Sequence, residues 1–174
     1  KILEFTGFHP VEGTWFNTVN PQVGITITDL GGRAIIGPSV EYSTSKDGGA
    51  TWSEWKSAEN ELNAKSIDVF VTPMLSEGTD NRIMFRASDE AGNIMTSEAY
   101  NISIDVSGVH FQELRVNGDD DWEGMWLPDS IVDIEVDLQD PLSGVAGSTL
   151  QYRYSSRGRA DLNSAVWNSL NVQS

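Results

Sequence analysis

The sequence predicts an all-β protein built from antiparallel β-sandwiches, and two observations support this. Apolar residues alternate with polar ones over short stretches, as in strands that have one buried side and one solvent-facing side. Glycine, proline and asparagine separate these stretches, as turns require. No stretch keeps apolar residues at helical spacing for three turns. Short strands joined by frequent turns are typical of antiparallel sandwiches.

Five stretches carry the alternation and are the predicted strands. In residues 23–28 the branched side chains of Val23, Ile25 and Ile27 alternate with glycine and threonine. Because successive side chains of a strand point to opposite faces, these three residues share one buried side. The other predicted strands are 67–72, 82–88, 100–105 and 132–138. Turn-forming pairs separate them, among them Asn20-Pro21, Gly31-Gly32, Gly48-Gly49, Gly92-Asn93 and Asn117-Gly118.

An internal repeat runs through the chain. A tryptophan, a strand that ends in aspartate, a tyrosine and a second tryptophan follow one another twice. The members are Trp15, Asp29, Tyr42 and Trp55 in the first copy, and Trp126, Asp140, Tyr152 and Trp167 in the second. The first tryptophan precedes the aspartate by 14 residues in both copies, and the aspartate precedes the tyrosine by 13 and 12. The offset of about 111 residues is close to the size of an immunoglobulin-like domain.

The repeat predicts two domains, a complete sandwich over 1–105 and a second repeat over 106–174. Nothing in the second repeat matches the strands at 67–71, 83–87 and 100–104, so we expect it to contain only the first half of a sandwich. Half a sandwich leaves open sheet edges and an uncovered apolar face. We therefore expect either self-association through the second repeat or a place for this chain within a longer protein.

Charge and cysteine content narrow the range of partners. With 11 basic and 26 acidic side chains the net charge is −15, which argues against nucleic acid as a partner. The charge is shared almost equally, −8 over residues 1–105 and −7 over 106–174. Without cysteine the chain has no disulfide and no thiolate zinc site. No apolar run is long enough for a membrane helix, so we expect no membrane insertion within this segment.

The residues of the first repeat resemble a known class of module. The pattern comprises Trp15, the strand ending in Asp29, residues 40–43, Trp52 with Trp55, and the stretches 85–93 and 102–105. It is similar to tandem immunoglobulin-like or fibronectin-III-like repeats of large prokaryotic, especially archaeal, cell-surface, S-layer and adhesin-like proteins. The resemblance implies an extracellular structural or binding module. Its partners would be other modules of the same parent protein and a cell-surface protein or glycan.

Residues 45–52 match the Asp-box pattern S-x-D-x-G-x-T-W, which is typical of sialidases and related propellers. The pattern describes a hairpin in which Asp47 accepts backbone N–H groups, glycines supply positive φ, and Trp52 packs beneath the turn. We interpret it as a structural hairpin. A glycan-related role is the alternative.

Two acidic segments are candidate calcium sites, and no other cofactor is expected. Asp119, Asp120 and Asp121 form the densest acidic run, and Asp89 with Asn93 brackets a second loop. Calcium prefers clustered carboxylate and carbonyl oxygens. The alternatives are a solvated loop for the first segment and, for the second, a hairpin turn in which Asp89 accepts local amides.

Two further residues are candidates for contact with carbohydrate. Among the six tryptophans, Trp122 lies in a polar loop and is the candidate ligand-binding residue, whereas recurrence at equivalent positions favours core packing for the others. Asn101 begins the one N-x-S/T sequon of the chain, and the alternation places it outward, where glycosylation is sterically allowed in a secreted protein.

We expect no catalytic residues. The nucleophile-elbow, zincin, P-loop and dinucleotide-binding motifs are absent from the sequence, and we expect its two histidines, His9 and His110, to be half-buried strand residues. The leading interpretation is a non-enzymatic spacer, scaffold or adhesive module of an extracellular surface protein. The alternative is a carbohydrate-binding or accessory module of a secreted glycoside-active enzyme.

Overall fold

The computed structural model describes residues 3–11, 13–31, 34–121, 123–124, 126, 131–155 and 165–169. Their secondary structure is almost entirely β, so the predicted all-β class is confirmed. The chain forms two compact units, Lys1–Ser107 and Gly108–Ser174, named unit 1 and unit 2. The predicted domain boundary, after residue 105, lies two residues before this division.

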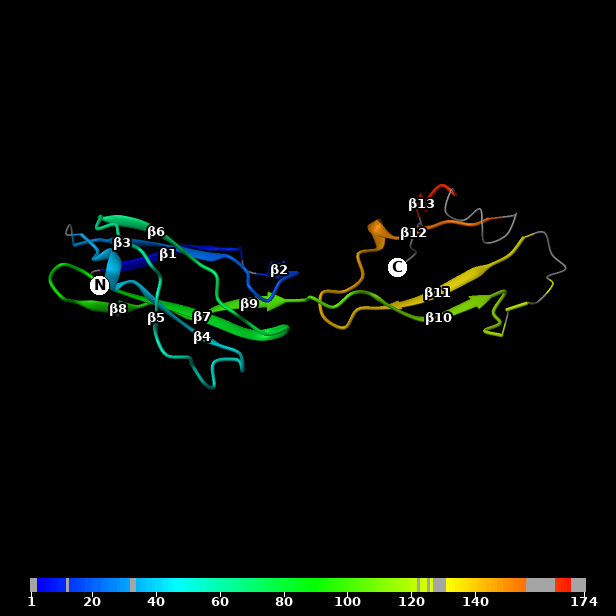
Figure 1. Cartoon of the computed structure of the whole chain (residues 1–174), viewed down its shortest axis with the longest axis horizontal. Helices are drawn as coiled ribbons and strands as arrows, with labels where there is room; N and C mark the ends of the chain where they lie inside the picture. Colours follow the sequence, from blue (N-terminus) through cyan, green and yellow to red (C-terminus); the bar gives the residue numbers. More distant parts are fainter. Residues whose placement is uncertain are drawn as a thin grey trace. The chain divides into compact units, whose positions relative to one another are not determined.

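Two sheets form unit 1 (Figure 1). The first has the order β1-β3-β6, and its strands are β1 (Leu3–His9), β3 (Val23–Asp29) and β6 (Ser66–Val71). The second has the order β2-β9-β7-β4-β5, with β8 also paired to β7. Its strands are β2 (Trp15–Phe16), β4 (Glu41–Ser45), β5 (Lys56–Ser57), β7 (Gly78–Ser88), β8 (Ile94–Thr96) and β9 (Tyr100–Ile104), and a 3-10 turn, η1 (Gly37–Ser39), precedes β4.

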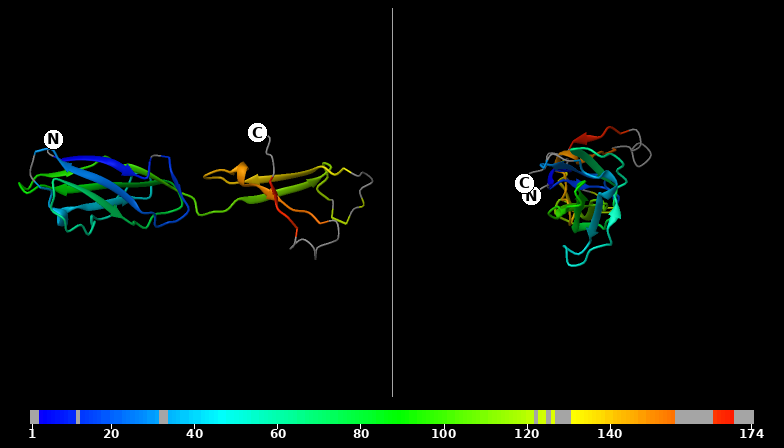
Figure 2. Two further views of the ribbon diagram at one scale, coloured as in Figure 1. Left: turned by 90° about the horizontal axis from the view of Figure 1, so that it is seen from above. Right: turned by 90° about the vertical axis from the view of Figure 1, so that its left-hand side faces the viewer.

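The strand order of unit 1 is that of an immunoglobulin-like sandwich. Strands β1, β3 and β6 take the places of A, B and E in one sheet, and β4, β7 and β9 take those of C, F and G in the other. Pairing is antiparallel throughout these strands, and β2 adds a short parallel pairing to β9. The sheets form two layers, seen from the side in Figure 1 and from above in Figure 2.

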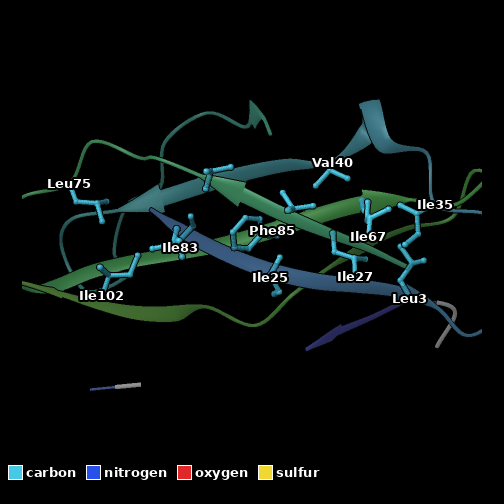
Figure 3. Packing of buried hydrophobic residues seen from close by; sticks show 14 of the residues in the cluster. Leu3, Ile25, Ile27, Ile35, Val40, Ile67, Leu75, Ile83, Phe85 and Ile102 are labelled. Atoms are coloured by element: carbon cyan, nitrogen blue, oxygen red, sulfur yellow. The ribbon is translucent and has the colours of Figure 1, made fainter. Parts of the chain in front are cut away.

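The core lies between the two layers and follows from the period-two pattern (Figure 3). Ile25 pairs with Val69 and Ile27 with Ile67 across β3 and β6, and all four point inward. Phe85 of β7 meets them from the second sheet, and none of the five is more than 3% exposed. Burial of branched and aromatic side chains on both inner faces is what holds two sheets together.

A bulge in β1 changes which of its side chains face the core. The pairing of β1 with β3 shifts between Thr6 and His9, where Gly7 has a φ of 60°. The shift turns Phe8 toward the second sheet, and its ring stacks on Tyr100 with 4.2 Å between centroids. Both histidines lie at strand ends and are exposed, so their predicted half-burial is wrong. The end of a strand leaves such a side chain without neighbours on one side.

Unit 2 contains two short β-ribbons in its described residues. β10 (His110–Val116) pairs with β11 (Ile134–Gln139), and β12 (Gln151–Tyr152) pairs with β13 (Asn168–Ser169). A 3-10 turn, η2 (Gly147–Thr149), precedes β12, as η1 precedes β4. The predicted strand at 132–138 corresponds to β11. The left panel of Figure 2 shows the two ribbons of this unit.

Candidate functional site

The outward side of the second sheet of unit 1 carries Asn101 from the predicted candidates, with Trp52 at its edge, and several side chains that were not predicted. Along β7, Arg82, Met84 and Arg86 alternate with the buried residues that face the core. The register places Ser45 of β4 and Asn101 of β9 on either side of Arg82. Neighbouring strands lie about 4.8 Å apart, so these three side chains form one row across the sheet. We call this surface, with Trp52 and Trp55 beside it, the outer face.

The turn that follows β4 borders the outer face and is closed by its own side chains (Figure 1, between β4 and β5). The Ser45 hydroxyl donates to Oδ1 of Asp47 at 2.7 Å, and the backbone N–H of Gly49 donates to the Ser45 hydroxyl at 2.9 Å. Thr51 donates its N–H to Oδ1 of Asp47 at 2.9 Å and its hydroxyl to Oδ2. These donors, the Thr51 hydroxyl first, lower the pKa of Asp47 to about 2.

Trp52 is oriented by the same turn. Gly48 and Gly49 have φ values of 71° and 94°, which side chains with a Cβ rarely adopt. Their conformation points the carbonyl of Gly49 at the indole, and Nε1 of Trp52 donates to it at 3.1 Å. The Trp52 side chain remains half-buried at the edge of the outer face.

Arg86 has two partners among the side chains of the outer face. Its Nε donates to Oε2 of Glu41 at 2.6 Å, and its guanidinium lies 4.3 Å above the ring centroid of Trp55. An ion pair and a cation–π contact thus hold one side chain. The three residues form a closed group on the outer face.

Arg82 lies on the same strand and the same face, yet it has no hydrogen-bond or ion-pair partner among the described residues. Its Nε is sealed from solvent without an acceptor. A methyl group placed on Gly49 would lie 3.4 Å from Cδ of Arg82 and 3.8 Å from Cζ2 of Trp52, so both side chains border that glycine. Sequence reasoning did not select Arg82 or Arg86, although arginines at alternate positions of an amphipathic strand were visible in the pattern.

Asn101 is exposed beside Arg82, so its side-chain amide is accessible to solvent or to a modifying enzyme. Glycosylation there stays a prediction. The other candidate tryptophan, Trp122, lies outside the described residues.

The two predicted calcium sites, at Asp89 with Asn93 and at residues 119–121, differ in burial and in hydrogen bonding. Asp89 is buried, and its Oδ1 accepts the backbone N–H groups of Ala91 and Asn93, each at 2.9 Å. Its Oδ2 accepts the Asn93 side-chain amide at 2.9 Å, as the turn alternative expects. Asp119, Asp120 and Asp121 are exposed, and Oδ1 of Asp119 accepts the N–H of Asp121. Among the described residues no group of three or more acidic or histidine side chains is arranged to hold a metal ion.

The β10–β11 ribbon of unit 2 has one charged side and one apolar side. On the charged side, Arg115 contacts Glu113 and lies 3.6 Å from both Glu135 and Asp137. The Glu113 charge, followed by the other carboxylates, raises the pKa of Arg115. The apolar side carries exposed side chains, among them Phe111, Leu114, Ile134 and Val136.

A hollow of about 310 Å³ lies where β1 meets the segment that joins β8 to β9. Leu3, Phe5 and Tyr100 supply apolar walls, and Glu4 and Glu98 supply carboxylates. Burial, followed by the Glu98 charge, raises the pKa of Tyr100. Sequence reasoning did not predict this hollow, because it depends on how the two sheets meet.

Comparison with known proteins adds no family to these observations. No family model matches the chain, and no curated protein matches it. Within the described residues, no helix has the length and apolar character needed to cross a membrane.

Proposed function

We propose that the chain is a non-enzymatic structural and adhesive module of a larger extracellular surface protein, where tandem immunoglobulin-like repeats act as spacer or scaffold. A spacer must transmit force through a compact sandwich without yielding at its ends. Unit 1 offers such a sandwich, with a buried hydrophobic core and long antiparallel pairings.

The observation that carries the proposal is how unit 1 ends. After β9, the N–H of Asp105 donates to the carbonyl of Phe16 at 2.8 Å. The carboxylate of Glu77 then accepts the N–H of Val106 at 3.3 Å and the N–H and hydroxyl of Ser107, the N–H at 2.9 Å. Hydrogen bonds therefore hold the last residues of unit 1 against the sandwich, as a module that transmits load requires.

Pairings in unit 2 support the tandem arrangement. Gln151 pairs with Ser169 and Tyr152 with Asn168, as Glu41 pairs with Ser57 and Tyr42 with Lys56. In addition, the guanidinium of Arg153 lies 4.6 Å from the ring centroid of Trp167, the counterpart of Trp55 in the sequence repeat. We propose that the apolar side of the β10–β11 ribbon packs against a further module or a second copy of this chain.

Stretching the whole chain by its two ends in optical tweezers tests the spacer function. Unit 1 has 107 residues, so we expect one cooperative unfolding step to a contour length of roughly 350–385 Å. Glu77→Ala should lower the unfolding force, whereas Glu61→Ala, an exposed control, should leave it unchanged. Gradual extension of unit 1 at low force would contradict the proposal.

The second candidate function is carbohydrate binding, and the outer face favours it. An oriented, half-buried tryptophan beside an unpaired arginine and an exposed asparagine supplies one apolar surface and several hydrogen-bonding groups. Isothermal titration with oligosaccharides tests this function, and loss of binding in Trp52→Ala with the fold intact is the expected result.

A further inference from the structure

We propose that the part of the outer face formed by Arg82, Trp52 and Asn101 binds a saccharide that bears a carboxylate. The proposal rests on the carbohydrate-binding function given above as the second candidate, and it names the chemical class of the ligand. Three separate features of the structure support it: an unpaired guanidinium, a fixed aromatic ring and an exposed amide.

The unpaired guanidinium is defined by comparison with Arg86. The two arginines are four residues apart on β7 and point to the same side of the sheet. Arg86 has Glu41 and Trp55 as partners, whereas Arg82 has neither a carboxylate nor an acceptor for its sealed Nε in the described part of the chain. Among the described residues, Arg82 is therefore a charged side chain of the outer face whose guanidinium has no protein partner.

The planar guanidinium of Arg82 favours a planar anion as its ligand. A guanidinium presents its N–H groups in a rigid fork that matches two oxygens of one carboxylate. Only Nε of Arg82 is sealed, so its terminal nitrogens reach the surface where such an anion arrives. Of the nearby carboxylates, Asp47 is engaged by Ser45 and Thr51, and Asp80 forms no ion pair with Arg82 among the described residues.

The aromatic ring and the amide select a sugar. The C–H face of a pyranose packs on an aromatic ring, and Trp52 is held for this by its bond to the Gly49 carbonyl. Sugar hydroxyls need groups that both donate and accept, and the exposed amide of Asn101 does both. Asn101 pairs with Arg82 on the β9 side, and the turn that carries Trp52 borders Arg82 on the β4 side, so a ligand whose carboxylate meets Arg82 is flanked by both.

The net charge of the chain limits how acidic the ligand is. At −15 the protein repels polyanions at long range. Salt at physiological concentration screens charges over about 8 Å, so a single carboxylate in contact with Arg82 is still favoured. A short uronic acid saccharide, with one carboxylate per residue and no sulfate, has a lower charge density than a polysulfated chain and is therefore repelled less.

The test uses the whole chain, produced without glycosylation so that Asn101 is free. Isothermal titration compares trigalacturonic acid with the neutral galactotriose and with inorganic sulfate. We expect the acidic trisaccharide to bind best, and Arg82→Gln to weaken it at least about tenfold, the scale of a charge-assisted bidentate contact. Arg86→Gln is the matched control on the same strand and should change its affinity less than about twofold. Trp52→Phe, which keeps a ring but loses the bond to Gly49, should weaken both trisaccharides.

Each other outcome overturns the inference in a distinct way. Equal binding of the acidic and neutral trisaccharides, unaffected by Arg82→Gln, would leave carbohydrate binding standing and remove the acidic specificity. Sulfate binding as tight as the acidic trisaccharide would show an anion site without a sugar. No binding of any probe by a chain with an intact far-ultraviolet spectrum would remove the carbohydrate-binding function as well.

Discussion

The guanidinium of Arg86 lies 4.3 Å above the indole ring of Trp55 and joins β7 to the segment that leads into β5. We expect Arg86→Met, which keeps the aliphatic stem, to lower the free energy of unfolding by about 1 kcal/mol, because the cation–π contact and the half-exposed ion pair with Glu41 are lost together. Urea denaturation measures this. Arg82→Met is the control and should cost less, since it removes a donor that has no acceptor. Equal losses would contradict the assignment of partners.

The low pKa of Asp47 predicts a dependence of stability on pH. The pKa of the Asp47 carboxyl falls from 3.8 to about 2 on folding, so its charged form stabilises the folded state at pH values above about 4. This contribution disappears as the pH falls through 2. We therefore expect Asp47→Asn to lower the melting temperature at pH 6, and the difference from the original chain to shrink between pH 4 and pH 2. A difference that stays constant over this range would show that the carboxylate does not hold the turn through its charge.

Gly37 and Gly108 differ in how much room their surroundings leave for a side chain. A Cβ on Gly37 would lie 2.4 Å from the carbonyl oxygen of Leu62 and 2.8 Å from its backbone nitrogen, and backbone atoms cannot move aside as a flexible side chain can. We expect Gly37→Ala to cost about 1–3 kcal/mol of stability through overpacking. Gly108→Ala is the control, because a Cβ there meets nothing within 4 Å. Thermal denaturation of both variants tests this. An unchanged melting temperature for Gly37→Ala would contradict the close contact between Gly37 and the backbone of Leu62.

The sequence predicts β3, β6, β7, β9 and β11 from the alternation of apolar and polar residues, but it did not predict β1 or β10, which are as long as β3. The alternation in 23–28 and 67–72 anticipates β3 and β6 to within a residue at either end. β7 begins at Gly78, four residues before its predicted start, because its first part is polar and is held by pairing with β9. β2 has two residues and pairs in parallel with β9. A strand this short is too brief for an alternation of apolar and polar residues, so the sequence around it does not predict it.

The sequence predicts those parts of the candidate site that depend on neighbouring residues, and it misses those that depend on distant strands. The turn at 45–52 is local, and its motif anticipated the bonds of Asp47 and the positive φ of its glycines. The isolation of Arg82 was not predictable, because it depends on which carboxylates other strands bring to the outer face. Glu41 reaches Arg86 through the register of β4 and β7, and a register is a property of the folded sheet.

The apolar side of the β10–β11 ribbon predicts association through unit 2. Phe111 is 78% exposed and Ile134 is 60% exposed, and adjacent exposed apolar residues on one side of a ribbon favour contact with a partner. We expect the chain to show a concentration-dependent rise in mass by sedimentation equilibrium, and Phe111→Lys with Ile134→Lys to abolish it. Ile94→Lys is the control in unit 1, where a comparably exposed residue, 71%, lies on the short strand β8. The association should strengthen at higher salt, because screening reduces the repulsion between copies that each carry −15. A monomer at every concentration and salt, or equal effects of the control and the double variant, would show that the ribbon does not mediate contact between copies.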